Sequence, residues 1–147
     1  MKQLDKNSGK IKAILVIIII TLAFIWGNSL MTGEVSSSIS EWFREVLNKL
    51  FHFAKSSKEV GSGHLLRKLM HFTEFMILGI ELTIFKKNSK KYGRSPVILA
   101  GLLIALVDET IQLFIQGRAG MIKDVWIDFS GFMTGFILVT VVRKLRA

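Results

Sequence analysis

The stretch DETIQLFIQGRAGMIKDVWID (residues 108–128) places charged and amide side chains among residues that are apolar enough to lie inside a membrane. The polar residues singled out are Asp108, Glu109, Gln112, Gln116, Arg118, Asp124 and Asp128. A charged side chain in the middle of a membrane span costs about 2.5–3.5 kcal/mol on insertion scales. Residues placed at that cost are usually paired and usually functional, so this stretch indicates a buried polar site in a membrane protein.

The composition of the whole chain agrees with a membrane protein. Of its 147 residues, 50% are hydrophobic, and they occur in blocks. The formal net charge is +9, and the basic residues gather at the ends of the apolar blocks, a pattern of membrane orientation rather than of nucleic-acid binding. The chain has no cysteine, which excludes disulfides, thiolate nucleophiles and cysteine-bound metals. We expect one membrane domain over residues 1–147, with the lipid bilayer and no nucleic acid as a partner.

Four blocks are long enough to cross a bilayer, because about 20 helical residues span a hydrocarbon core of about 30 Å. The predicted spans are residues 11–30, 65–85, 96–116 and 124–142. The first block is longer than the roughly 7–15 apolar residues of a cleaved signal peptide, so we expect a retained anchor. The predicted fold class is therefore all-α: an integral membrane four-helix bundle.

The distribution of lysine and arginine predicts the orientation of the bundle. The N-terminal tail, the 86–94 loop and the C-terminal tail are all basic, and four spans would place them on one side. By the positive-inside rule this side is cytoplasmic, so the chain is multi-pass with both termini in the cytoplasm. The 31–64 loop has balanced charge and is expected outside, with the 117–123 turn. The 86–94 run could also bind anionic lipid.

The outer loop contains SISEWFREVLNKLFHFAK (residues 38–55), which predicts an amphipathic helix between the first two spans. Its apolar face would carry Ile39, Trp42, Phe43, Val46, Leu47, Leu50 and Phe51. Its polar face would carry Ser40, Glu41, Arg44, Asn48 and Lys49. We expect this extracytoplasmic helix to lie in the outer membrane interface or to cap the bundle.

Polar residues in the last three predicted spans fall three or four positions apart, and each set therefore forms a stripe along one helix face. The stripe of span 65–85 comprises Arg67, His71, Glu74 and Glu81, with Leu78 between the last two. The stripe of span 96–116 comprises Asp108, Gln112 and Gln116, with Glu109 at its edge. The stripe of span 124–142 comprises Asp124 and Asp128, followed by Gly131 and Gly135. We expect the three stripes to meet inside the bundle as a polar cavity. All but Glu81 fall in the extracytoplasmic half, so the cavity would open outward.

Two segments, RKLMHFTEFMILG (67–79) and DETIQLFIQGRAGMIKDVWIDFSGFMTG (108–135), resemble the VanZ-like family of small bacterial membrane proteins. The family pattern is H-x-x-E in one span, then D/E-x-x-Q and a turn rich in glycine and arginine, then D-x-x-x-D-x-x-G-x-x-x-G. The matching residues are His71, Glu74, Asp108, Glu109, Gln112, Arg118, Asp124, Asp128, Gly131 and Gly135. The resemblance implies a role in the bacterial cell membrane, in accessory resistance to the lipoglycopeptide teicoplanin, and implies no particular chemical activity.

Two readings of His71 and Glu74 stay open. They could form a proton relay or a metal pair, or simply hydrogen-bond neighbouring helices, which contributes about 0.6 kcal/mol on average in membranes. The chain has three histidines, two of them in the outer loop, so we expect no metal and no cofactor. The Gly131-x-x-x-Gly135 pattern predicts close helix packing; the same face could instead join copies of the chain in a homo-oligomer.

Glu109 and Asp128 also have two readings. They could be the general acid and base of a reaction on a lipid-linked headgroup, since burial separates the roles of such carboxyl pairs. Alternatively, they could belong to a structural network of ion pairs with Arg67 and Arg118.

The expected function is protection against teicoplanin-type antibiotics, by binding of the antibiotic or of a lipid-linked cell-wall precursor in the outward-facing cavity. The expected binding residues are Arg67, His71, Glu74, Asp108, Glu109, Gln112, Gln116, Arg118, Asp124 and Asp128. One alternative is a membrane-embedded hydrolase or transferase that uses His71, Glu74, Glu109 and Asp128. Another is a small proton-coupled transporter that uses His71, Glu74 and Glu81.

Overall fold

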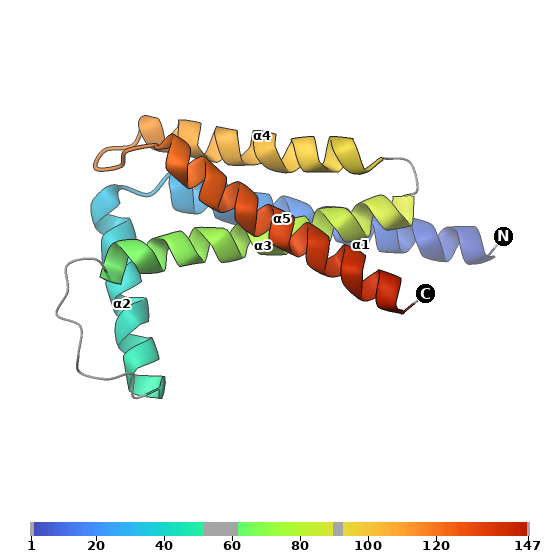
Figure 1. The fold of residues 1–147 in the computed structure, drawn as a ribbon, viewed down its shortest axis with the longest axis horizontal. Helices are drawn as coiled ribbons and strands as arrows, with labels where there is room; N and C mark the ends of the chain where they lie inside the picture. The colour runs from blue at the N-terminus through green and yellow to red at the C-terminus, as the bar shows by residue number, and fades with distance from the viewer. Residues whose placement is uncertain (1, 52–61, 90–92, 147) are drawn as a thin grey trace.

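The computed structural model describes residues 2–51, 62–89 and 93–146, and all regular structure in these ranges is helical. The helices are α1 (Lys2–Ser29), α2 (Gly33–Phe51), α3 (Ser62–Ser89), α4 (Arg94–Leu113) and α5 (Ile122–Leu145). Four of them run lengthwise through the molecule, and α2 lies across one end of this bundle (Figure 1). The prediction of an all-α fold is confirmed.

Three helical segments in the described part are long and apolar enough to cross a membrane: Ser8–Ser29, Arg94–Leu113 and Ile122–Leu145. Helix α3 has the length of a span, but its charged residues keep it out of this set. It nevertheless packs against every other helix, most extensively against α5. That α3 is a fourth span stays a prediction.

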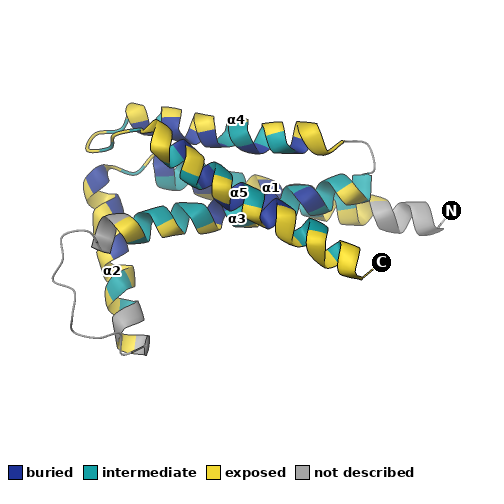
Figure 2. Ribbon diagram, in the orientation of Figure 1, coloured by how far each residue is buried: buried dark blue, intermediate teal, exposed yellow. Residues whose placement is uncertain are grey.

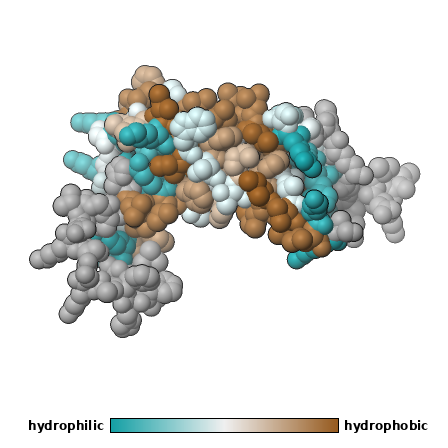
Figure 3. Space-filling model, in the orientation of Figure 1, coloured by the Kyte–Doolittle hydropathy of each residue, from teal (hydrophilic) through white to brown (hydrophobic). Residues whose placement is uncertain are grey.

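The outer surface of the bundle is apolar, as expected for helices that face lipid. On α1, Ile19 and Ile20 are each 63% exposed, whereas Ile25 on the opposite face is completely buried. Residues with little exposure line the faces where the helices meet (Figure 2). In the space-filling view, an apolar band covers the middle of the visible face and polar residues gather toward both ends (Figure 3). This surface would suit a bilayer, whose hydrocarbon core lies between two polar interfaces.

Glycines bring α3 and α5 into backbone contact. A Cβ atom on Gly131 would collide with the carbonyl oxygen of Phe72, and one on Gly135 with that of Met76. On α3, a Cβ on Gly79 would collide in the same way with the carbonyl oxygen of Phe132. Small residues allow membrane helices to approach this closely, and the contact fixes how far α3 and α5 can slide along each other.

Several helix ends differ from those predicted. Helix α4 starts after Gly93 rather than after Ser95, and it ends at Leu113 rather than at residue 116. The chain then turns through Gly117, which has a φ of 73°, a conformation that suits glycine. The backbone oxygen of Gln116 accepts a hydrogen bond of 3.1 Å from the amide of Gly33, which ties this turn to the start of α2.

Helix α2 starts at Gly33, earlier than the predicted 38–55 helix, and residues 52–55 lie outside the described residues. Two of its serines are buried, since Ser36 and Ser40 are almost fully covered, whereas Ile39, Trp42 and Phe43 of the expected apolar face are exposed.

Candidate functional site

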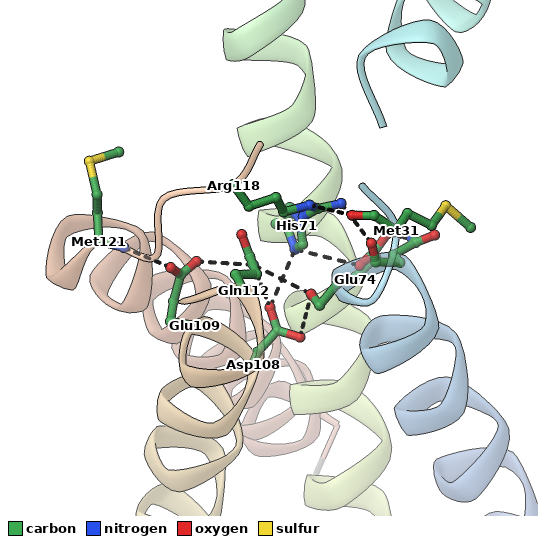
Figure 4. Close-up of polar contacts among 10 residues, drawn as sticks. Met31, His71, Glu74, Asp108, Glu109, Gln112, Arg118 and Met121 are labelled. Carbon is green, nitrogen blue, oxygen red and sulfur yellow. Dashed lines mark hydrogen bonds and ion pairs between the residues drawn. The ribbon is translucent and has the colours of Figure 1, made fainter. Parts of the chain in front are cut away.

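Polar side chains from α1, α3, α4 and α5, and from the α4–α5 turn, meet inside the bundle near the end that carries α2 (Figure 4). We call this set the polar cluster; it comprises Asn28, Ser29, His71, Glu74, Asp108, Glu109, Gln112, Arg118 and Asp128. The cluster joins the stripes that the sequence predicted on three helices to two residues of α1.

Helix α4 contributes a hydrogen-bond network around Asp108, which is completely buried. Ser29 Oγ donates a hydrogen bond of 2.7 Å to Asp108 Oδ1. Gln112 Nε2 donates to Asp108 Oδ2 at 3.0 Å and to Glu109 Oε1 at 3.2 Å. The other oxygen of Glu109 accepts a bond of 2.9 Å from the backbone amide of Met121. These three side chains of α4 therefore have defined positions, because buried polar groups need hydrogen-bond partners.

Helix α3 contributes His71 and Glu74, one turn apart. Asn28 Nδ2 donates a bond of 2.7 Å to Glu74 Oε1. His71 Nδ1 lies 3.8 Å from Glu74 Oε2 and 3.9 Å from Asp108 Oδ2. Both distances are too long for hydrogen bonds, and His71 Nδ1 has no partner in the described part of the chain. The imidazole thus faces two carboxylates without bonding to either one.

Arg118, in the turn between α4 and α5, bonds to backbone rather than to acids. Its Nε donates to the carbonyl oxygen of Met31 at 2.9 Å, and its Nη2 to that of Asn28 at 2.6 Å. These bonds connect the α4–α5 turn to the α1–α2 corner. Burial, reinforced by the charge of Arg67, lowers the pKa of the Arg118 guanidinium, which nevertheless stays protonated at neutral pH.

The ion pairs therefore differ from the predicted network. Asp124 pairs with Lys68 across a distance of 2.6 Å, and that lysine was not among the predicted site residues. Arg67 forms no hydrogen bond or ion pair with any residue that the structure describes. Asp128 is 1% exposed, and its Oδ2 has no partner among the described residues.

Two hollows flank His71 and Arg67. The larger has about 320 Å³ of empty space, part of it open to the outside, and is lined by Asn28, Met31, Ser36, Ile39, Ser40, Arg67, Met70, His71, Glu74 and Arg118. The second, of about 260 Å³, is lined by Arg67, Lys68, His71, Glu109, Gln112, Asp124, Ile127 and Asp128. Arg67 and Asp124 thus lie at the edge of the polar cluster and face these hollows.

Two predicted polar residues lie elsewhere. The side chain of Gln116 is exposed, because α4 ends before it and the helical stripe stops there. Glu81 lies two turns beyond Glu74 on α3, where its Oε1 accepts a hydrogen bond of 2.9 Å from Thr21 Oγ1 of α1.

Sequence reasoning missed the contribution of α1. Asn28 and Ser29 stand at the end of an otherwise apolar block and hold Glu74 and Asp108, respectively. Their placement next to the outer loop was a usable signal, since polar residues in a span are rarely left without partners.

Apolar helices of membrane length that surround a buried polar cluster define this molecule as a helical membrane protein. The family model described as VanZ/LLP1 matches residues 13–143, and the chain belongs to this family. The resemblance that the sequence predicted is thereby confirmed. Comparisons with curated proteins and with solved structures gave no match.

Proposed function

We propose that this protein limits the action of teicoplanin-type lipoglycopeptides by binding the membrane-anchored antibiotic, or a lipid-linked cell-wall precursor, at the polar cluster. In this proposal α3 is the fourth span, both termini are cytoplasmic and α2 lies at the outer interface. Membership of the VanZ/LLP1 family supports the role. The observation that carries the proposal is the hollow beside Arg67, a cation without a partner among the described residues.

The arrangement of the helices supports this orientation. Both termini lie at the end of the bundle opposite α2, together with the last turn of α3 and the start of α4 (Figure 1). Basic residues gather at that same end, in the last turn of α3, at the start of α4 and in the last turn of α5. An end rich in lysine and arginine belongs in the cytoplasm, which would place the polar cluster in the outer half of the membrane.

The hollow suits a charged headgroup rather than a whole antibiotic. Its empty space of about 320 Å³ includes space open to the outside, so the enclosed part of the hollow is small. Arg67 and the unpartnered Nη1 of Arg118 would bind an anionic group, while Glu74 and His71 would contact hydroxyls or amines. The remainder of the ligand would lie along the exposed apolar residues of α2.

Replacing Arg67 by alanine is expected to abolish protection without unfolding the protein, because this side chain holds no described part of the fold together. The measurement is the teicoplanin susceptibility of a sensitive Gram-positive host that carries each variant at matched membrane levels. Lys68→Ala is the control: it removes a neighbouring cation that already pairs with Asp124. Equal protection by Arg67→Ala and wild type would refute the binding proposal. Failure of wild type to protect would refute the resistance role.

A second candidate is a membrane-embedded hydrolase or transferase. The observation that favours it is the position of His71, within 4 Å of the carboxylates of Glu74 and Asp108. Groups this close could exchange protons with a substrate.

Glutamine substitutions separate the two candidates. Glu74→Gln and Glu109→Gln retain hydrogen-bonding groups but remove proton transfer. A binding site should keep part of its protection in both variants, whereas loss of general acid–base catalysis costs about 10²–10⁴-fold in rate. The same teicoplanin susceptibility assay measures the protection that each of the two variants gives. Glu81→Gln, in a residue bonded to Thr21 and outside the polar cluster, is the matched control. If it too abolished protection, a proton-coupled transporter would become the better account.

A further inference from the structure

We propose that His71, Asp108 and Asp128 form a binding site for a divalent transition-metal ion such as Zn²⁺. One ring nitrogen of His71 and one carboxylate oxygen from each aspartate lie within 4.8 Å of one another. The three residues come from α3, α4 and α5, whose polar stripes were predicted to meet inside the bundle. The inference concerns a bound ion and does not depend on the ligand proposed above.

Two of the three ligand residues, His71 and Asp128, have a buried polar atom without a hydrogen-bond partner among the described residues, whereas both oxygens of Asp108 accept hydrogen bonds from Ser29 and Gln112. Asp128 is 1% exposed, and its Oδ2 has no hydrogen-bond partner in the part of the chain that the structure describes. The same is true of His71 Nδ1 and of Glu74 Oε2, which lie 3.8 Å apart. Buried polar atoms are nearly always satisfied in folded proteins, so three such atoms in one place require an explanation. A cation shared by His71, Asp108 and Asp128 would satisfy the atoms of His71 and Asp128, and Glu74 Oε2 lies 3.8 Å from His71 Nδ1.

The charge of the polar cluster also favours a cation. Four carboxyl groups, those of Glu74, Asp108, Glu109 and Asp128, are buried in it. Within the described residues, none of them forms an ion pair with a lysine or arginine; Lys68 is bound to Asp124. Arg118 directs its two hydrogen bonds to backbone oxygens. Buried charges need a counter-ion, a metal or a proton. A divalent ion would offset two of the four negative charges.

The geometry is close to that of a metal site. Zinc binds nitrogen and carboxylate oxygen at about 2.0–2.2 Å in tetrahedral geometry, so two of its ligand atoms lie roughly 3.3–3.6 Å apart. The donor atoms here lie within 4.8 Å of one another, so the most widely spaced pair would close by up to about 1.5 Å when the ion binds. The distance of 3.9 Å between His71 Nδ1 and Asp108 Oδ2 exceeds the tetrahedral spacing by a few tenths of an ångström. Side-chain rotation would supply the remaining movement, because Asp128 Oδ2 is not held by another group.

The donor set selects the kind of metal. An imidazole with carboxylates favours Zn²⁺ or Mn²⁺, whereas Mg²⁺ and Ca²⁺ prefer oxygen ligands alone. Three protein ligands leave a fourth position, which Glu74 or a water molecule could fill. Zinc sites with three protein ligands and an open position are those that act on substrates, while structural sites usually have four. The open position would face the hollow beside Arg67, since His71 lines that hollow.

Zinc binding to the purified full-length chain in lipid nanodiscs, stripped with EDTA, tests this site. Isothermal titration and elemental analysis after dialysis should show one Zn²⁺ per chain. Asp128→Asn and His71→Gln should each weaken binding by at least about 100-fold, the upper range seen when groups that merely support ligands are removed. Glu81→Gln, which changes a half-buried acid on the same helix that bonds Thr21, should bind as wild type does.

Thermal unfolding provides the check on folding. Zn²⁺ should raise the Tm of wild type and of Glu81→Gln and leave the Tm of the two ligand variants unchanged, because only a protein that binds the ion is stabilised by it. Without metal, Asp128→Asn should be at least as stable as wild type, since it removes an unpaired buried carboxylate. If one of the two ligand variants does not fold, zinc binding by the other variant decides the test. Absence of stoichiometric Zn²⁺ in wild type, or unchanged binding in a folded ligand variant, would overturn the proposal.

Discussion

Replacing Gly135 by alanine is expected to lower the free energy of unfolding by about 3 kcal/mol, the upper end of the usual range for overpacking. The new Cβ atom would collide with the backbone oxygen of Met76, and a helix backbone cannot rotate away as a side chain can. The two helices would have to separate along their longest contact. Because stabilities of about 5–15 kcal/mol are typical, this loss should visibly reduce the amount of folded protein.

The measurement is reversible unfolding in mixed detergent micelles, followed by helical circular dichroism. Gly27→Ala is the matched control, because Gly27 is also helical but a Cβ atom there would have nothing within 4 Å. By helix propensity alone, this control should be neutral or stabilising by up to about 1 kcal/mol. Equal stability of Gly135→Ala and Gly27→Ala would mean that α3 and α5 do not touch as described.

Replacing Arg118 by methionine is expected to cost roughly 3 kcal/mol or more of stability. It removes the two hydrogen bonds to the carbonyl oxygens of Met31 and Asn28, and bonds of this charge-assisted kind contribute about 1.5–3 kcal/mol each. Arg118→Lys keeps the charge but can reach only one of the two oxygens well, so it should lose about half as much.

The same unfolding assay applies, with proteolysis of the α1–α2 corner as a second readout. Loss of the guanidinium should expose this corner to protease before the bundle unfolds. If Arg118→Met were as stable as wild type, the guanidinium would not be a structural link, and its whole charge would be available to a ligand.

Helix periodicity and the energetic cost of buried charge were sufficient to predict much of the polar cluster. His71, Glu74, Asp108 and Asp128 fall on inward faces because three- and four-residue spacing determines which side of a helix a residue occupies. Periodicity does not say where a helix ends, so Gln116 was placed on a stripe that stops at Leu113. Nor does it identify partners on other helices, which is why the links from Asn28 and Ser29 went unpredicted.

The sequence also could not predict which of the charged residues form ion pairs with each other. Arg67 and Lys68 are adjacent, and their side chains lie about 100° apart around the helix axis. Only the rotation of α3 against α5 decides which of them reaches Asp124, and the structure selects Lys68. The face of α2 was ambiguous for a similar reason: a helix at a membrane surface can direct its apolar side to lipid as well as to protein.

The glycine contacts have a consequence for motion. Helices α3 and α5 meet backbone to backbone, so they form a stiff pair that carries His71, Glu74 and Asp128. Helix α4 touches this pair differently, since its Gly101 faces the ring of Phe132, a side chain that can turn. A small tilt of α4 would therefore cost less than any shift between α3 and α5. Such a tilt would change the gap between Asp108 and Asp128, and with it the room for whatever the polar cluster binds.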